Sequence, residues 1–388
     1  MAEAAAVWAA SRAALAILTV GLLLLLRGDA GGEMFRPTTI LTWERWDTRW
    51  YLAIAQHGYF SRDSANFFPL YPLLTAVFSQ ALAAFTGLGL SPELRLAAAL
   101  AVSNLGALVG FVAIALLADD EREGRHALTA LVAYPLAFFM AAAYTEGPFL
   151  ALAGLTLLFA RRGRWGWAWL TSFLAGLTRS TAIVLILPLL WEFWRQRDLP
   201  ELARERGWRQ LPFLPGILSR DLLGAAAAAS GVPVGMGLYM AFLGFRFGDP
   251  LLFVHTQQST WHHVLSPPWS TLQQAAAQAP LPISGLEPLD LALVLLFGLL
   301  TMAGARRLPF AYTLYTIGLL ALILVSPVAT EHDTVASSGR YLLAAIPCFL
   351  LLGRLLTQRP ALQLLVLGSG FMLQALLAAV FLSGGPVL

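Results

Sequence analysis

The sequence predicts an all-α polytopic membrane protein, and three observations support this prediction. Of its 388 residues, 58% are hydrophobic and 12% are charged, whereas soluble domains carry about 25% charged residues. Apolar runs of helical length recur along the chain and are separated by short polar segments. All 25 basic residues are arginine, and they gather in a few clusters between the runs, as residues that set membrane topology do.

A helix needs about 20 apolar residues to cross a bilayer, and the chain offers about eleven candidate spans. They are Ala5–Leu26, Arg95–Leu117, Ala127–Ala143, Gly147–Ala160, Trp165–Thr178, Thr181–Trp194, Asp221–Phe245, Leu289–Ala303, Pro309–Ser326, Tyr341–Leu352 and Ala361–Leu382. The first run meets Arg27 without a cleavage site of small residues, so we expect a retained transmembrane helix instead of a signal peptide.

The arginine clusters predict the orientation of these spans, because cytoplasmic loops carry an excess of basic residues. All five later clusters lie on one side if a single span leads out and a single span leads back between neighbouring clusters. If the N-terminus lies in the cytoplasm, the first loop lies outside. A twelfth apolar run, Leu70–Leu88, then has to be re-entrant or interfacial. Arginines in the first loop argue locally against this placement, and we give the five later clusters more weight.

This topology predicts one integral membrane domain over residues 1–388. Its parts are a first extracytoplasmic loop at 27–68, core helices at 70–194, a basic cytoplasmic loop at 195–220, and C-terminal helices at 221–388 with an extracytoplasmic loop at 246–288. Five of the six histidines fall on the extracytoplasmic side, so polar chemistry is expected there. The high Ala, Leu, Gly and Arg content is typical of GC-rich bacteria, so we expect the bacterial inner (plasma) membrane.

The segment WERWDTRWY in the first loop places an acid among aromatic residues. Read as a helix over Thr42–Gln56, at about 100° per residue, it has one narrow aromatic face. That face is formed by Trp43, Trp46, Trp50 and Ile54. Asp47 projects from its edge, whereas Arg45 and Arg49 lie opposite. Such an amphipathic helix suits the membrane interface, and a carboxylate at its apolar side is suited to accept a proton. The alternative is that Asp47 braces the helix through a distant arginine such as Arg179 or Arg340.

Four segments of the first half resemble a known family. WDTRWYLAIAQHGY, NFFPLYPLL, AYTEGPFL and GLTRSTAIVLILP are similar to segments of the PIG-V-type mannosyltransferases, bacterial relatives of the enzyme that adds the second mannose of the glycosylphosphatidylinositol anchor. These enzymes belong to the GT-C class of polytopic glycosyltransferases. The segments cover Trp46–Pro188, and a later segment, SSGRYLLAAIPCF, is similar to the family's Arg-Tyr-Pro pattern.

The resemblance implies a GT-C-like bundle of about 11 transmembrane helices, with an amphipathic juxtamembrane helix in the first extracytoplasmic loop. It also implies an inverting transfer of a sugar, mannose, from a polyprenyl-phosphate donor to a hydroxyl group of a lipid or glycolipid acceptor. The transfer would take place on the extracytoplasmic side, among membrane lipids. Asp47 matches the first-loop acid that acts as general base in GT-C enzymes.

Further residues are candidates for substrate binding. The aromatic candidates around Asp47 are Trp46, Trp50, Tyr51 and Tyr144. Glu146 is expected either to contact sugar hydroxyls, to pair with an active-site arginine, or only to start a helix. Arg179 interrupts a long apolar stretch, and an arginine there is expected to be paired or functional. Arg179 or Arg340 suits the donor phosphate, because a guanidinium forks onto phosphate oxygens; snorkelling or a salt bridge is the alternative.

The histidines at 255, 262, 263 and 332 do not follow a zinc-site spacing, so no metal or other cofactor is expected. His262 and His263 are instead candidates for hydrogen bonds to donor phosphate or acceptor sugar, and a surface loop is the alternative. The single cysteine, Cys348, excludes an intramolecular disulfide. A net charge of +3 is too small to argue for nucleic acid as a partner.

Two other functions stay open at this point. A GT-C enzyme could use another polyprenyl-phosphate sugar. A transporter or flippase for a lipid-linked glycan would also need arginines in a membrane cavity, but such proteins often carry internal repeats and polar residues deep in their spans. The chain shows no clear repeat and almost no charge within its spans.

Overall fold

The computed structural model describes residues 1–27, 37–197, 217–278, 287–329, 334–385 and 387, and within these ranges it is helical. The helices are α1 (Ala2–Arg27), α2 (Asp47–His57), α3 (Leu70–Thr86), α4 (Pro92–Leu117), α5 (Glu121–Val132), α6 (Glu146–Arg161), α7 (Trp165–Gly176), α8 (Ile186–Arg195), α10 (Ile217–Ala229), α11 (Gly231–Phe247), α12 (Leu252–Ser259), α13 (Pro268–Gln278), α14 (Glu287–Gly304), α15 (Phe310–Val325), α16 (Ser338–Tyr341), α17 (Ile346–Thr357) and α18 (Pro360–Leu382). Short 3-10 turns lie at Pro37–Trp43, Asp63–Asn66, Ala137–Met140, Ser180–Leu185 and Leu342–Ala344. The all-α prediction is confirmed for these residues.

Three of the described helices are long and apolar enough to cross a membrane: α1, α4 and α18. Two bent pairs pass the same test only when their members are taken together. Leu223–Ala229 and Gly231–Phe247 meet at 58°, and Ser338–Ala344 and Ile346–Thr357 meet at 77°. Counting each pair once gives up to five spans by length and composition. The chain therefore carries membrane-spanning helices, whereas the expected number of eleven stays a prediction, because the other helices are shorter.

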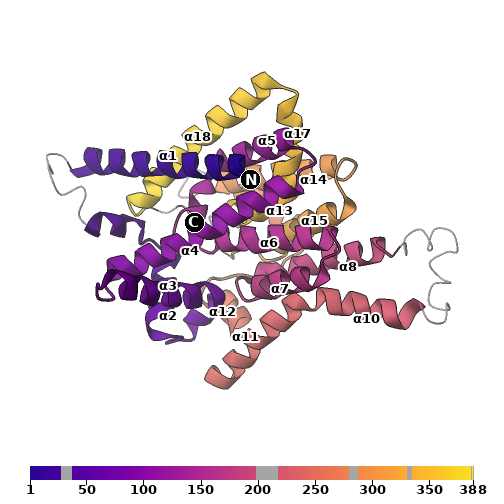
Figure 1. Cartoon of the computed structure of the whole chain (residues 1–388), viewed down its shortest axis with the longest axis horizontal. Helices are drawn as coiled ribbons and strands as arrows, with labels where there is room; N and C mark the ends of the chain where they lie inside the picture. Colours follow the sequence, from indigo (N-terminus) through magenta and orange to yellow (C-terminus); the bar gives the residue numbers. More distant parts are fainter. Residues whose placement is uncertain (28–36, 198–216, 279–286, 330–333, 386, 388) are drawn as a thin grey trace.

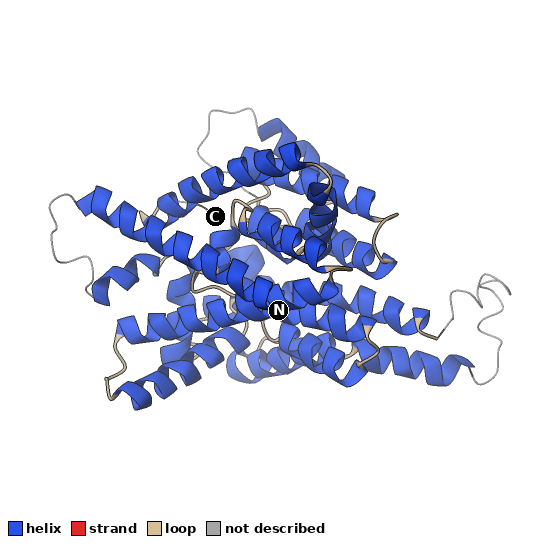
Figure 2. Cartoon of the chain, turned by 45° about the horizontal axis from the view of Figure 1, so that its top comes forward, coloured by secondary structure: helices blue, strands red, loops and turns tan. Residues whose placement is uncertain are grey.

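Figures 1 and 2 show the arrangement of the helices along the long axis of the molecule. α2 and α3 lie toward one end of that axis, whereas α8 and the start of α10 lie toward the other. The run expected at Leu70–Leu88 is α3, which packs along α4. Its re-entrant or interfacial placement stays a prediction.

The expected span Ala127–Ala143 is not one helix. α5 ends at Val132, because Pro135 removes a backbone donor and restricts the residue before it. Residues 133–145 then run through the protein interior with only one 3-10 turn, and nearly all of them are buried. Four polar side chains from other helices hydrogen-bond carbonyl oxygens of this region: Gln374 of α18, Asn104 and Ser103 of α4, and Arg12 of α1. These bonds satisfy backbone groups that a helix would have satisfied itself.

The helices α4 and α6 cross closely next to this segment. A Cβ atom at Gly106 of α4 would lie 2.5 Å from the backbone nitrogen of Pro148, and one at Gly147 of α6 would overlap the carbonyl oxygen of Ser103. Only glycine allows the two backbones to approach this closely. The crossing holds the start of α6, and with it Glu146, against α4.

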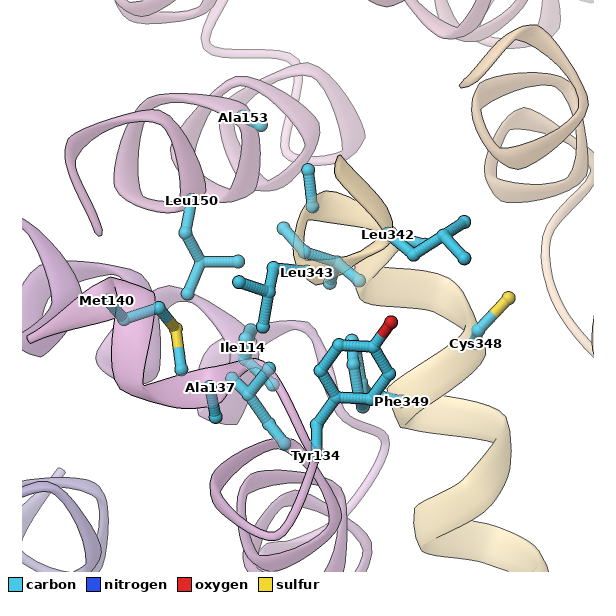
Figure 3. Packing of buried hydrophobic residues seen from close by; sticks show 14 of the residues in the cluster. Ile114, Tyr134, Ala137, Met140, Leu150, Ala153, Leu342, Leu343, Cys348 and Phe349 are labelled. Atoms are coloured by element: carbon cyan, nitrogen blue, oxygen red, sulfur yellow. The ribbon is translucent and has the colours of Figure 1, made fainter. Parts of the chain in front are cut away.

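The main hydrophobic core joins segments that are far apart in the sequence (Figure 3). Tyr134 and Met140 of the irregular segment, Leu150 of α6 and Phe349 of α17 are among its members. The Tyr134 hydroxyl donates a 2.7 Å hydrogen bond to the carbonyl oxygen of Gly339. The core thus ties the irregular segment to the region around α16.

Candidate functional site

A pocket of about 620 Å³ opens where the start of α2 meets segments from the second half of the chain. It is lined by Arg45, Trp46, Asp47, Arg49, Trp50, Asn66, Phe67, Gln257, Trp261, His263, Val328, Ala336, Ser337, Arg340, Tyr341 and Gly384. Five of the predicted site residues are therefore in its wall: Trp46, Asp47, Trp50, His263 and Arg340. Its walls come from parts of the chain up to more than 300 residues apart.

The structure corrects the expected helix over Thr42–Gln56. α2 begins only at Asp47, because Trp46 adopts a positive φ of 47°, which breaks the helix before it. Trp43 belongs to the preceding 3-10 turn and packs against Phe381, so the continuous tryptophan face does not form. Arg45 precedes α2, and Arg45 and Arg49 line the same pocket as Asp47.

Asp47 pairs with an arginine that follows it by 293 residues. Arg340 Nη1 donates a 2.8 Å hydrogen bond to Asp47 Oδ2. Among the residues that the structure describes, the other carboxylate oxygen has no protein partner. The side chain of Asp47 is 22% exposed, and that of Arg340 is 9% exposed. The carboxylate is thus held from one side and open to the pocket on the other.

Arg340 is placed by its own short helix, α16. Ser337, just before it, has a positive φ of 61°, and the amide of Gly339 donates a 2.7 Å hydrogen bond to Asp290 Oδ1. A Cβ atom at Gly339 would lie 2.5 Å from Leu136 Cδ1 and 2.6 Å from Asp290 Oδ1. These contacts of Gly339 fix the position of the backbone from which the Arg340 side chain extends to the pocket.

The ion pairs continue behind the pocket. Arg340 Nε lies 3.2 Å from Glu146 Oε1, but not in line for a hydrogen bond, and Arg179 Nη1 donates a 2.8 Å hydrogen bond to the same oxygen. Glu146 Oε2 has no hydrogen-bond partner in the described part of the chain. Asp47, Arg340, Glu146 and Arg179 thus form one chain of alternating charge, and we call it the charge chain. Because its two carboxylates balance its two guanidiniums, it has no net charge.

The positions of Glu146 and Arg179 match what their sequence context predicts. Glu146 is the first residue of α6, where the helix dipole favours a carboxylate, and it is also the partner of two arginines. Arg179 lies in the extended link between α7 and the 3-10 turn Ser180–Leu185, so it does interrupt the apolar stretch. Neither side chain lines the large pocket; they lie around a small cavity behind Arg340.

Tyr51 and Tyr144 do not line the pocket but pack next to residues that do. The Arg340 guanidinium lies 5.4 Å from the centre of the Tyr144 ring, and the Tyr144 hydroxyl donates to the carbonyl oxygen of Arg45 over 3.4 Å. Tyr51 packs edge-on against Phe67 and Tyr71. Burial, together with the nearby Asp47 carboxylate, raises the pKa of Tyr51 well above its usual range, so its phenol stays neutral.

An aromatic wall closes one side of the pocket. Trp50 stacks on Phe67 at 5.4 Å between ring centres and lies 6.3 Å from Trp261. Trp46, which is 43% exposed, lines the pocket beside Asp47. Flat apolar faces beside polar groups suit the binding of a sugar ring, which has both kinds of surface.

The two adjacent histidines are separated by the backbone. His263 lines the pocket, whereas His262 is exposed, adopts a positive φ of 55° and is not part of the pocket wall. His263 Nδ1 lies 2.8 Å from the carbonyl oxygen of Ser326. Burial lowers the pKa of His263, and the Ser326 carbonyl opposes this shift only partly.

Several lining residues were missed from the sequence. Asn66 and Phe67 belong to the NFFPLYPLL segment, and Trp261 precedes the two histidines, so their motifs could have identified them. Ser337 begins the SSGRYLLAAIPCF segment and could have been identified in the same way, whereas Gln257 carried no such signal. In the described ranges no group of three or more His, Cys, Asp or Glu side chains could hold a metal ion, and residues 332 and 333 lie outside those ranges.

The comparisons with known proteins agree with the motifs. Residues 38–214 match the sequence model of the mannosyltransferase (PIG-V) family. Over 147 residues the chain is 30% identical to GPI alpha-1,6-mannosyltransferase 2 of Rattus norvegicus, which corresponds to 37% of this chain and 30% of the rat enzyme. The resemblance to PIG-V-type mannosyltransferases is thereby confirmed in the first half of the chain, and the alignment spans less than a third of the length of that relative.

Solved structures with a similar course of the chain are distant in sequence. One is ArnT from Cupriavidus metallidurans bound to undecaprenyl phosphate, with 15% identity over 86% of this chain and 72% of that one, at a TM-score of 0.48. Another is the oligosaccharyltransferase of Archaeoglobus fulgidus, with 14% identity over 96% of this chain and 53% of that one, at a TM-score of 0.45.

Proposed function

We propose that this chain is a membrane-bound mannosyltransferase. It moves mannose from a polyprenyl phosphate to a hydroxyl group of a lipid or glycolipid at the extracytoplasmic face, with inversion at the anomeric carbon. The observation that carries the proposal is the half-buried carboxylate of Asp47, which is held by Arg340 on one side and open to a pocket of about 620 Å³ on the other. The match of residues 38–214 to the mannosyltransferase (PIG-V) family supports the reaction type.

Asp47 acts as the general base in this proposal. Its free oxygen accepts the proton of the acceptor hydroxyl while the hydroxyl oxygen attacks the anomeric carbon. The bond from that carbon to the phosphate oxygen breaks on the opposite face, and its electron pair stays on the phosphate. The polyprenyl phosphate therefore leaves as an anion and needs no proton from the protein.

Arginine side chains stabilise the negative charge that develops on the phosphate. Of the two arginines expected in this role, Arg340 lines the pocket, whereas Arg179 lies behind it and donates to Glu146. We therefore assign the phosphate contact to Arg340 and a supporting position to Arg179. Arg45 and Arg49 also line the pocket, and they add positive charge that the neutral charge chain does not supply.

A second pocket on α2 supports a substrate with a hydrocarbon chain. It has a volume of about 570 Å³, and its wall is almost wholly apolar. Asp47 and Trp50 line the first pocket, whereas Ile54 and Gly58 line the second. These positions follow one another at helical spacing on one face of α2. A lipid-linked sugar could thus keep its polar head beside Asp47 and its chain along the same helix.

The test of the function is product analysis. Purified protein is incubated with a panel of polyprenyl-phosphate sugars and candidate inositol lipids, and products are identified by mass spectrometry. We expect a new glycolipid and free polyprenyl phosphate only with the mannose donor. A product from another sugar donor would instead establish a different donor specificity. If folded protein left all candidate lipids unchanged, the proposed transferase activity would be rejected.

Asp47→Asn tests the general base. The folded variant should lose transfer by roughly 100-fold or more, because an amide cannot accept the proton. Glu44→Gln is the matched control, since Glu44 precedes Asp47 by three residues and is not part of the pocket wall. Full activity of purified Asp47→Asn protein would reject the mechanism.

A further inference from the structure

The wall of the pocket carries both charged and neutral polar side chains. The charged groups come from the start of α2 and from Arg340. Among the neutral groups, Gln257 Nε2 donates a hydrogen bond to Asn66 Oδ1, and the amide of His263 donates a 2.9 Å hydrogen bond to the carbonyl oxygen of Gln257. These contacts hold three neutral polar side chains, those of Asn66, Gln257 and His263, in one part of the wall.

The tautomer of His263 follows from its hydrogen bond. Ser326 Oγ lies 3.3 Å from Nδ1 and could donate to it, but the carbonyl oxygen of Ser326 is closer, at 2.8 Å, and can only accept. The shorter contact favours the tautomer in which Nδ1 carries the hydrogen. In the neutral ring Nε2 then has a free lone pair and no hydrogen. Burial lowers the pKa of His263, which favours this neutral form near pH 7. Within the described part of the chain, no protein group is hydrogen-bonded to Nε2.

The backbone holds the ring in this position from both sides. His263 forms an antiparallel bridge with Val328, and the amide of Val264 donates to the carbonyl oxygen of Pro327 over 3.0 Å. His262 adopts a positive φ, and its side chain lies at the surface. Two histidines of identical chemistry therefore occupy different environments one residue apart.

We propose that His263 is a specificity-determining residue, whose Nε2 accepts a hydrogen bond from a sugar hydroxyl in this pocket. This inference rests on the proposed function and assigns one of its contacts. A phosphate group is the wrong ligand for this atom, because a lone pair repels phosphate oxygens. The hydroxyl can belong to the transferred sugar or to the acceptor, and the experiment below separates these sources.

His263→Asn is the informative variant. Its amide nitrogen can replace Nδ1 and keep the hydrogen bond to Ser326, but nothing replaces Nε2. We expect KM for one of the two substrates to rise by roughly 3- to 10-fold, as the loss of one hydrogen bond between neutral groups gives, with kcat changed much less. His262→Asn is the matched control and should behave like the wild type.

Deoxy substrates identify the hydroxyl. For the analogue that lacks the contacted hydroxyl, wild type and His263→Asn should have the same KM, whereas the other analogues keep the difference. An effect on the donor KM assigns the contact to the transferred sugar, and an effect on the acceptor KM assigns it to the acceptor.

Unchanged KM values in His263→Asn, or equal effects of both histidine variants, would overturn the inference while leaving the function intact. Loss of kcat without a change in KM would overturn it as well. If the wild type transfers no sugar at all, the proposed function fails, and this inference fails with it.

Discussion

At the residue scale, the site depends on the four members of the charge chain. Each interior charge has an opposite neighbour within 3.2 Å, which is the condition under which charges persist in a protein interior. The charge chain also explains how a residue from the far end of the sequence positions the carboxylate that we propose as the general base. Asp47 is held by Arg340, and Arg340 is held in turn next to Glu146.

Removal of Glu146 should therefore weaken the whole fold. Glu146→Gln keeps the shape of the side chain but leaves two buried guanidiniums with one carboxylate. We expect a loss of roughly 3–5 kcal/mol in the free energy of unfolding. The measurement is thermal unfolding in detergent. Unfolding is monitored by the reaction of a maleimide with Cys348, which is buried in the folded protein.

The control for this change is Glu3→Gln. Glu3 lies 3.6 Å from Arg125, and both side chains are about half exposed. Exposed pairs contribute about 0–1 kcal/mol, so this variant should unfold close to the wild-type temperature. Equal midpoints for the two variants would show that the buried chain does not stabilise the protein.

At the scale of elements, the irregular segment 133–145 helps to position the site. It carries Tyr144 to the site and leads directly into Glu146, and it is held by side chains from α1, α4 and α18. The close crossing of α4 and α6 fixes its far end. The position of the second carboxylate thus depends on backbone packing as well as on charge.

Gly147→Ala tests this crossing. The added methyl group would overlap the carbonyl oxygen of Ser103, so the helices must move apart. We expect a loss of roughly 1–3 kcal/mol in stability together with reduced transfer, because Glu146 moves with its helix. Both quantities are measured on the purified protein.

Gly237→Ala in α11 serves as the comparison, since no atom lies within 4 Å of the position that its added methyl group would take. Alanine is favoured over glycine in a helix interior by about 1 kcal/mol, so this variant should be at least as stable as the wild type. A destabilised Gly237→Ala beside an unaffected Gly147→Ala would contradict the packing argument.

At the scale of the whole molecule, the two ends carry different chemistry. The pocket lies where α2 meets the segments around residues 261–263 and 337–341. A separate network joins Arg354 to Glu123 at 2.8 Å and to Asp119, which also lies 3.4 Å from Arg161. The residues of this network come from the arginine clusters that the charge rule places in the cytoplasm.

Site-directed cysteines test the orientation of these ends. In a Cys348→Ala background, we expect Leu265→Cys, at a position that is 81% exposed, to react with an impermeant maleimide added to intact cells. Arg162→Cys, on the exposed turn after α6, should react only after the membrane is permeabilised. The reverse pattern would place the pocket on the cytoplasmic side and contradict the proposed location of the reaction.

The sequence alone determined that the protein is a helical membrane protein, and it identified the segment WERWDTRWY, which contains Asp47. Composition and the recurrence of apolar runs are local properties, so they predicted a helical membrane chain without any knowledge of packing. Helical periodicity, the position of Arg179 in an apolar stretch and the resemblance to PIG-V-type segments selected Asp47, Glu146, Arg179 and Arg340 before any distance between them was known.

Only the tertiary structure decided how these residues are arranged. The different environments of His262 and His263 depend on neighbours that are distant in the sequence, whereas the end of α5 before Pro135 is a local effect of the proline. Periodicity assumed a helix through Trp46, but the positive φ of that residue breaks it. A period describes one helix by itself, whereas the contact between Asp47 and Arg340 joins residues that only the folded chain brings together.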